Sequence, residues 1–111
     1  MKLMTKEIEQ KLLNAPIYSK DGMGKDAEVV VKYHNPEGAG VWLITEGEKI
    51  EDTDNWLFFG YCNIFEWEWG YVSLSDLQSV STIEIDFNVP EGATVRDLCD
   101  EPKYTSPIEE R

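Results

Sequence analysis

The sequence predicts a small α+β protein: a single domain built on an antiparallel sheet of about five strands, with an N-terminal helix and one or two short helices packed on it. Three observations support this fold class. Short β-branched or aromatic segments follow one another with brief connections, which is typical of an antiparallel meander. An amphipathic helical pattern opens the chain. No internal repeat or long linker divides the 111 residues, so we expect one domain over residues 1–100.

The first predicted element is a helix over residues 6–14, because Ile8 and Leu12 recur at helical spacing and Thr5 can serve as its N-cap. Asn14 and the Ala15–Pro16 pair end the helix. A glycine-containing loop follows. Strands are then expected at 28–33 and 41–46, from Trp56 onward, and at 65–72.

Aromatic residues gather in the segment WLFFGYCNIFEWEWGYVSL, which spans residues 56–74. From residue 65 they alternate with polar or small residues, so that one strand face carries the row Phe65, Trp67, Trp69 and Tyr71. We expect this row to pack in the core, with Glu66 and Glu68 on the opposite, solvent-facing side. The alternative is that part of the row is exposed as a protein-binding patch, since Trp and Tyr are common interface anchors.

The remaining elements are shorter. Ser75 and Gln78 match a capping box and predict a short helix. Residues 82–87 alternate as a fifth strand, and its inward side chains are expected to be Ile83, Ile85 and Phe87. Thr94 is expected to cap one more helical turn that ends at Cys99. Residues 101–111 lack periodicity and are predicted to form a mobile acidic tail.

The charge balance restricts the possible partners. Asp and Glu outnumber Lys and Arg by 22 to 10, which gives a net charge of −12. Such a surface repels phosphate backbones and anionic lipids, so we expect no direct nucleic-acid or membrane binding but an unidentified protein partner, one with a basic surface. The charged, periodic N-terminus predicts no signal peptide, and Cys62 and Cys99 belong to no metal-binding spacing. We therefore expect a cytosolic protein with reduced thiols; its oligomeric state stays open.

Three residues are candidates for chemistry. Glu66 and Glu68 lie on one face of the predicted strand, about 7 Å apart, which suits a hard cation or an acid–base pair. His34 is the single histidine, and one imidazole does not make the multi-histidine sites typical of zinc or iron. A solvated strand face and an incidental histidine are the preferred interpretation, so no catalytic residue, metal site or cofactor is predicted.

A cluster of carboxylates precedes Trp56. It contains Glu46, Glu48, Glu51, Asp52 and Asp54, and further acids follow at Asp97, Asp100, Glu101, Glu109 and Glu110. Gathered on one surface, these groups could imitate a phosphate backbone and occupy the basic groove of a nucleic-acid enzyme. An ordinary solubilising surface is the simpler interpretation.

Several segments resemble a known family. They are LMTKEIEQKL near the N-terminus, DGMGKDAEVVVKYHNP, WLITEGE, WLFFGYC with EWEWGYVSLSDL, and TVRDL near the C-terminus. Together they resemble the domain of unknown function 2958, a family of small bacterial proteins often encoded on plasmids and integrative elements. The resemblance covers nearly the whole chain and implies an α+β fold in a mobile-element context. It implies no activity and no catalytic residues.

Three hypotheses about function follow. The leading one is a non-enzymatic protein-binding module, whose contact residues would be Trp67 and Trp69 or the acidic group Glu46, Glu48, Glu51 and Asp52. The first alternative is an acidic DNA-mimicking inhibitor of a host nucleic-acid enzyme. The second is a small metal-dependent enzyme that uses Glu66 and Glu68, with His34 as an additional ligand.

Overall fold

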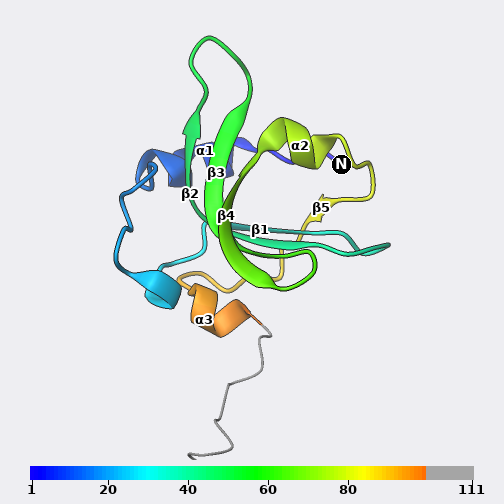
Figure 1. The fold of residues 1–111 in the computed structure, drawn as a ribbon. Coiled ribbons are helices and arrows are strands. Elements are labelled where there is room, and N and C mark those ends of the chain that lie inside the picture. The colour runs from blue at the N-terminus through cyan, green and yellow to red at the C-terminus, as the bar shows by residue number, and fades with distance from the viewer. Residues whose placement is uncertain (100–111) are drawn as a thin grey trace, which may run out of the picture.

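The computed structural model describes residues 1–99 and has a five-stranded sheet with helices on both faces (Figure 1). The strands are β1 (Val31–His34), β2 (Val41–Lys49), β3 (Trp56–Asn63), β4 (Trp67–Ser73) and β5 (Glu84–Ile85). They lie in the order β4-β3-β2-β1-β5, and every neighbouring pair is antiparallel. This confirms the predicted α+β class. The predicted acidic tail, 101–111, lies outside the described residues.

The α-helices begin at side-chain caps. Helix α1 (Lys6–Leu13) starts after Thr5, whose side chain accepts the N–H of Ile8 at 3.1 Å, as predicted. The short 3₁₀ helix η1 (Gly24–Asp26) and helix α3 (Val95–Leu98) follow later in the chain. Thr94 caps α3 as expected, and Asp97 completes a capping box with it.

Helix α2 (Leu74–Gln78) corrects the predicted capping box. Its N-cap is Ser73, paired with Asp76, in place of Ser75 and Gln78. The reason is that β4 runs directly to Ser73, so the helix starts at the residue where the strand ends. Ser75 instead donates its N–H to the side chain of Asn55 at 2.9 Å.

The main core lies between the sheet and the two helices α1 and α2. Tyr33 and Phe58 are fully buried at its centre, with ring centroids 5.8 Å apart. The Tyr33 hydroxyl donates to the Leu3 carbonyl at 2.6 Å, and burial raises the pKa of Tyr33 well above its ordinary value. The other members of this core are Leu3, Met4, Ile8, Leu12, Val31, Trp42, Ile44, Trp56, Leu74, Leu77, Ile83 and Ile85.

A smaller cluster lies on the opposite face, where α3 packs. It consists of Val29, Leu43, Tyr61 and Val95. In Figure 1, α1 and α2 both lie near the upper part of the sheet, to the left and right of β3, whereas α3 and η1 lie at the lower end. The second face is therefore covered over only part of its area.

Two predicted strands have different bounds. Residues 28–29 pair with residues 93–94, where Val29 donates its N–H to the Ala93 carbonyl at 2.8 Å. The regular pairing of β1 with β2 therefore begins only at Val31. The fifth strand is reduced to Glu84–Ile85, since only these residues pair with β1. Phe87, predicted to point inward, is 71% exposed because it lies beyond the end of this pairing.

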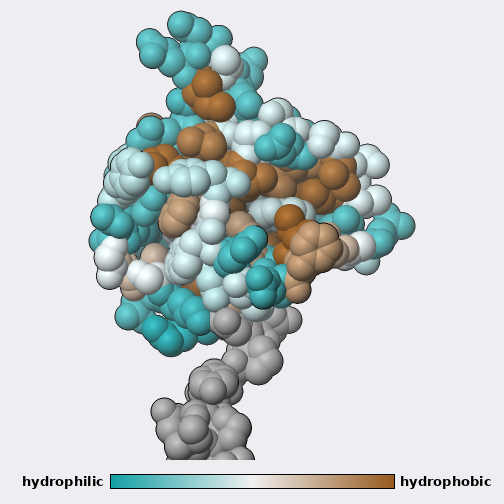
Figure 2. Space-filling view, viewed as in Figure 1, coloured by the Kyte–Doolittle hydropathy of each residue, from teal (hydrophilic) through white to brown (hydrophobic). Residues whose placement is uncertain are grey.

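The hairpin of β2 and β3 projects from the body of the molecule (Figure 1). Its strands remain paired from Val41 opposite Asn63 to Lys49 opposite Trp56, with a β-bulge between Ile44 and Glu46. Figure 2 shows that the projecting end is mainly hydrophilic. Among the helices of residues 1–99, none has the length and apolar character of a bilayer-crossing segment.

Candidate functional site

The aromatic row of β4 is not part of the main core. Trp69 is 38% exposed and Tyr71 52%, and Phe65 is 97% exposed in the turn before β4. Trp67 alone is half-buried against the smaller cluster. The prediction that the row packs in the core is therefore wrong, because β4 is an edge strand with a neighbour on one side only, and its aromatic face is turned away from α1 and α2.

Contacts between the aromatic rings of β3 and β4 hold the exposed side chains in place. Trp69 stacks on Phe59 with centroids 5.6 Å apart and an interplanar angle of 10°, and it also contacts Tyr61 at 4.8 Å. Tyr71 lies 4.9 Å from Phe59, and Trp67 stacks on Tyr61 at 5.1 Å. Such cross-strand aromatic pairs stabilise a sheet by about 0.2–1 kcal/mol each. The exposed rings are therefore held in place without a covering layer.

A groove of about 360 Å³ runs beside these rings. One wall is formed by the aromatic side chains of Phe59, Trp69 and Tyr71, and the other by the loop of residues 18–24. Ala27, Thr45 and Glu46 also line it. We call this feature the aromatic groove. Its volume lies within the range of ordinary ligand sites, about 300–1,000 Å³.

Glu46 positions the loop that forms the second wall. Its side chain is 4% exposed, and its carboxylate oxygens accept the N–H groups of Tyr18 and Lys20, each at 2.9 Å. Glu48 accepts the N–H of Ile17 at 3.2 Å. A buried carboxylate is stable only when its oxygens are hydrogen-bonded in this way. The β-bulge before Glu46 helps to direct its side chain toward the loop.

Ionisable side chains line the groove and shift one another's pKa values. A hydrogen bond with Tyr18 raises the pKa of the Tyr71 hydroxyl, and burial and the negative charges of Glu46 and Asp21 raise it further. Burial lowers the pKa of Lys20, although Glu28 and Glu46 partly oppose this effect, and the Lys20 ammonium group donates to the Glu28 carbonyl at 2.8 Å. The ammonium group of Lys20, which lines the groove, thus already has a partner within the protein.

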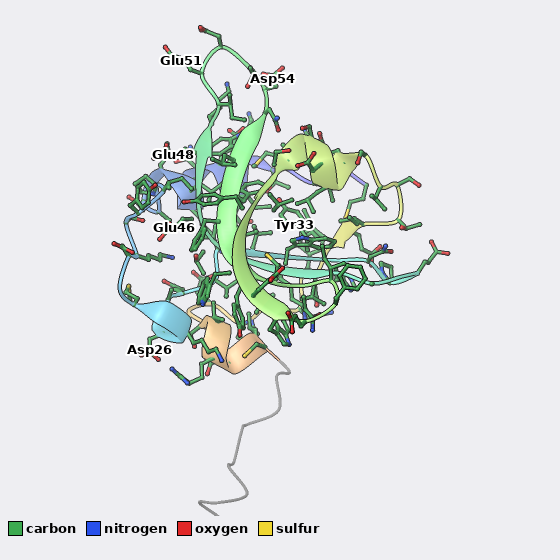
Figure 3. The ribbon with its side chains drawn as sticks, viewed as in Figure 1. Asp26, Tyr33, Glu46, Glu48, Glu51 and Asp54 are labelled. Carbon is green, nitrogen blue, oxygen red and sulfur yellow. The ribbon has the colours of Figure 1, made fainter. Side chains whose placement is uncertain are left out.

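The predicted acidic residues separate into two environments. Glu48, Glu51 and Asp54 are exposed on β2 or at the end of the hairpin (Figure 3), and Asp52 is exposed as well. Glu46 is buried and bonded to the loop, so its carboxylate is not part of this exposed surface. Asp97 lies on α3, at the opposite end of the molecule from the hairpin tip (Figure 1).

The three candidate residues for metal chemistry are not brought together. His34 lies on β1 and its Nε2 is 3.1 Å from Glu84. Glu68 lies on β4, which is three strand spacings, or about 14 Å, from β1 and His34. Glu66 is exposed in the turn that precedes β4. In the described part of the chain, no group of three or more His, Cys, Asp or Glu side chains could hold a metal ion.

Both cysteines are free thiols. Burial raises the pKa of the Cys62 thiol to about 12, and the charge of Glu68, its partner across the β3–β4 ladder, adds to this shift. A thiol with so high a pKa is a poor nucleophile at neutral pH. Cys62 is therefore a packing residue.

Sequence reasoning named Trp67 and Trp69 but missed the opposite wall of the groove. Tyr18 and Asp21 reach the sheet because the loop is tied to Glu46, a contact between residues 26 or more positions apart. Gly22 and Gly24 both have positive φ angles and allow the tight path of this loop. These glycines were the available signal, and they indicated a loop without indicating where it lies.

The fold and the groove define a class: a small acidic α+β protein with an exposed aromatic groove and a negatively charged surface. The chain belongs to the family described as "Protein of unknown function (DUF2958)", whose model matches residues 3–101. This confirms the family resemblance of the sequence. No curated protein and no solved structure matches the chain. The family description assigns no activity.

Proposed function

We propose that this protein is a non-enzymatic binding module that takes a cationic side chain of a protein partner into the aromatic groove. The observation that carries the proposal is the exposure of Trp69 and Tyr71 beside the exposed carboxylate of Asp21, in a groove that the buried Glu46 also lines. The faces of aromatic rings attract cations, and nearby carboxylates strengthen this attraction. Arginine fits best, because its planar, weakly hydrated guanidinium group stacks on aromatic rings.

The charge of the chain favours a protein partner over a nucleic acid. Aromatic platforms that stack nucleobases are accompanied by a basic groove that neutralises the phosphates. Here the net charge is −12, and Lys20, which lines the groove, already donates to a backbone carbonyl. A basic protein segment is attracted by the same field that repels a phosphate backbone.

The proposal is tested with a defined peptide probe. The probe is a capped peptide of alternating threonine and arginine, with the same length as β4, seven residues. Its affinity is measured by fluorescence anisotropy for the wild type, for Trp69→Ala and for the matched control Phe65→Ala, which removes an exposed ring outside the groove lining. We expect Trp69→Ala to weaken binding at least about tenfold and Phe65→Ala to leave it unchanged.

A second peptide, in which citrulline replaces arginine, keeps the shape and removes the charge. It should bind at least about tenfold more weakly than the arginine peptide. Equal affinity of the two peptides, or equal loss in both protein variants, would contradict the proposal. The melting temperature of each variant is measured alongside, so that a folding defect is recognised.

Imitation of a phosphate backbone is the second candidate function, favoured by the exposed acids Glu48, Glu51, Asp52 and Asp54 on the projecting hairpin. It would use a different surface. Replacing Glu51, Asp52 and Asp54 by Gln or Asn, and keeping Glu48 because it accepts the N–H of Ile17, should abolish capture of a basic nucleic-acid enzyme while leaving the arginine peptide bound in the aromatic groove. Capture that survives the neutralised hairpin would exclude mimicry.

A further inference from the structure

The two edges of the sheet differ in length. β5 closes one edge with only two residues, Glu84–Ile85, whereas β4 presents seven residues, Trp67–Ser73, at the other. Among the described residues, β4 pairs with β3 and with no other strand. Native proteins usually shorten or cover such an edge, because unpaired backbone groups are a template for another strand.

The hydrogen-bond pattern shows which backbone groups of β4 point outward. The Ile44 carbonyl accepts the N–H of Val30 at 2.8 Å and therefore faces away from β3. Ile44 lies opposite Gly60 in the β2–β3 ladder, so the N–H and C=O groups of Gly60 must point toward β4. There Gly60 lies opposite Gly70. Bonded and non-bonded pairs alternate in an antiparallel ladder. The N–H and C=O groups of the residues on either side of Gly70 consequently point toward the open edge.

Those two residues are Trp69 and Tyr71, which also carry the exposed rings of the aromatic groove. The end of the edge is closed, because the N–H of Ser73 is directed to Asp76 in the cap of α2. The same short stretch of β4 therefore offers free backbone hydrogen bonds and aromatic side chains together.

We propose that the partner segment binds as a sixth, antiparallel strand along the outer edge of β4, with cationic side chains at alternate positions packed on Trp69 and Tyr71. This inference rests on the proposed function and supplies its binding mode. Directly opposite residues in an antiparallel pair have Cβ atoms about 4.5–5.5 Å apart and share a sheet face. Residues that bond to the backbone of Trp69 and Tyr71 thus place their side chains beside the two rings.

Gly70 fits this arrangement. Glycine is unfavourable inside a strand and often marks the close approach of another backbone. A Cβ atom built at Gly70 would have no heavy atom within 4 Å, in contrast to Gly60 directly opposite, where the Leu43 carbonyl is in the way. The packing of residues 1–99 does not require glycine at position 70. The vacant space lies where the intervening side chain of an added strand would be placed.

Charge decides between a partner segment and a second copy of this chain. Pairing two β4 edges would bring together two molecules of net charge −12, with Glu66 and Glu68 of each near the contact. Like charges placed opposite one another across strands are destabilising. A basic extended segment has the complementary charge, and strand addition is an established way of binding such segments.

The test uses backbone N-methylation, which removes one peptide N–H without changing side-chain charge. The threonine–arginine peptide is prepared with methyl groups on its three arginine nitrogens or, as a matched control, on three threonine nitrogens. Antiparallel addition predicts that methylated arginines weaken binding at least about tenfold, because those N–H groups face β4, whereas methylated threonines keep the affinity within about threefold.

The outcomes separate this inference from the proposed function. If both methylated peptides bind like the parent while Trp69→Ala and citrulline still abolish binding, the groove recognises arginine and strand addition is wrong. If the parent peptide does not bind, the proposed function itself fails, and the binding mode with it. Sedimentation of the full chain should show a monomer. A dimer that the peptide disperses would assign the β4 edge to a second copy and overturn the inference.

Discussion

Tyr33 and Tyr71 are the same residue type on the same sheet, and they differ in almost every other respect. Tyr33 is fully buried on β1, and its hydroxyl donates to the Leu3 carbonyl at 2.6 Å. Tyr71 is half-exposed on the edge strand β4, and its side chain lines the aromatic groove together with Tyr18 of the loop. The residue type does not decide between core and site. The position of the strand in the sheet, and the presence of helices over that face, decide it.

The unequal covering of the faces explains this difference. Helices α1 and α2 both pack on the face of the sheet that contains Tyr33 and Phe58. The opposite face receives α3 against the smaller cluster, and the loop of residues 18–24 stands over the remainder at a distance that leaves the groove. The first face stabilises the fold, and the second is available for binding.

The largest expected difference between the faces is in the effect of removing a ring. Phe58→Ala should lower the free energy of unfolding by about 3–5 kcal/mol, because it leaves a cavity at the centre of the main core. Trp69→Ala on the open face should cost about 1 kcal/mol, the contribution of its cross-strand contacts. Urea unfolding measures both values. Equal losses would mean that the open face is a second core.

The glycine pair of the β3–β4 ladder provides a finer comparison. Gly60→Ala should destabilise the protein by about 3 kcal/mol or more, because the added Cβ would lie 2.0 Å from the Leu43 carbonyl oxygen. Gly70→Ala, directly opposite, meets no atom and should leave the melting temperature unchanged or slightly higher. A destabilised Gly70→Ala variant would show that the edge is already covered.

The buried carboxylate of the groove should behave differently from the acids of the hairpin. Glu46→Gln replaces one accepting oxygen by an NH₂ group that cannot accept the N–H of Tyr18 or Lys20, so we expect a loss of about 1–3 kcal/mol and a more mobile groove loop. Glu51→Gln at the exposed hairpin should change stability by less than about 0.5 kcal/mol. Limited proteolysis of residues 18–24 reports the loop directly. If residues 18–24 of Glu46→Gln were cleaved no faster than those of the wild type, Glu46 would not be the residue that positions the loop.

The smallest effect concerns pH. Burial alone would raise the pKa of Asp86, but the Asn88 N–H and the Lys32 ammonium group, 3.2 Å away, lower it overall. A carboxyl group with a lowered folded-state pKa contributes stability above its unfolded pKa of 3.8, and this contribution is lost as the pH falls through the folded-state value. Between pH 6 and 3, Asp86→Asn should therefore lose less stability than the wild type. If the urea midpoints of both proteins changed with pH by the same amount, the stabilising interaction of Asp86 with Lys32 and Asn88 would be contradicted.

Much of the fold followed from local patterns. The helix after Thr5 and the turn after Thr94 were predicted because a capping side chain and its backbone partner lie within a few residues of each other. The capping box at Ser75 was misplaced by two residues, because the sequence does not show how far β4 continues. Phe87 was placed inward because alternation does not reveal that pairing with β1 ends at Ile85.

The candidate site was predicted only in part. The period of two correctly placed Trp67, Trp69 and Tyr71 on one face of a strand. It could not show that this strand lies at the edge of the sheet, which depends on the order of all five strands. The second groove wall depends on the bond from Glu46 to the loop, a tertiary contact between polar groups that no periodicity encodes.

The central claim, that the open face of β3 and β4 binds while the covered face supports the fold, is tested most directly by NMR. The spectrum of the ¹⁵N-labelled full chain is followed during titration with the threonine–arginine peptide. We predict that the indole N–H of Trp69 and the amides of β4 and residues 18–24 shift, while the indole signals of the buried Trp42 and Trp56 stay constant. Shifts confined to the hairpin at residues 50–55, or no shifts at all, would contradict the account.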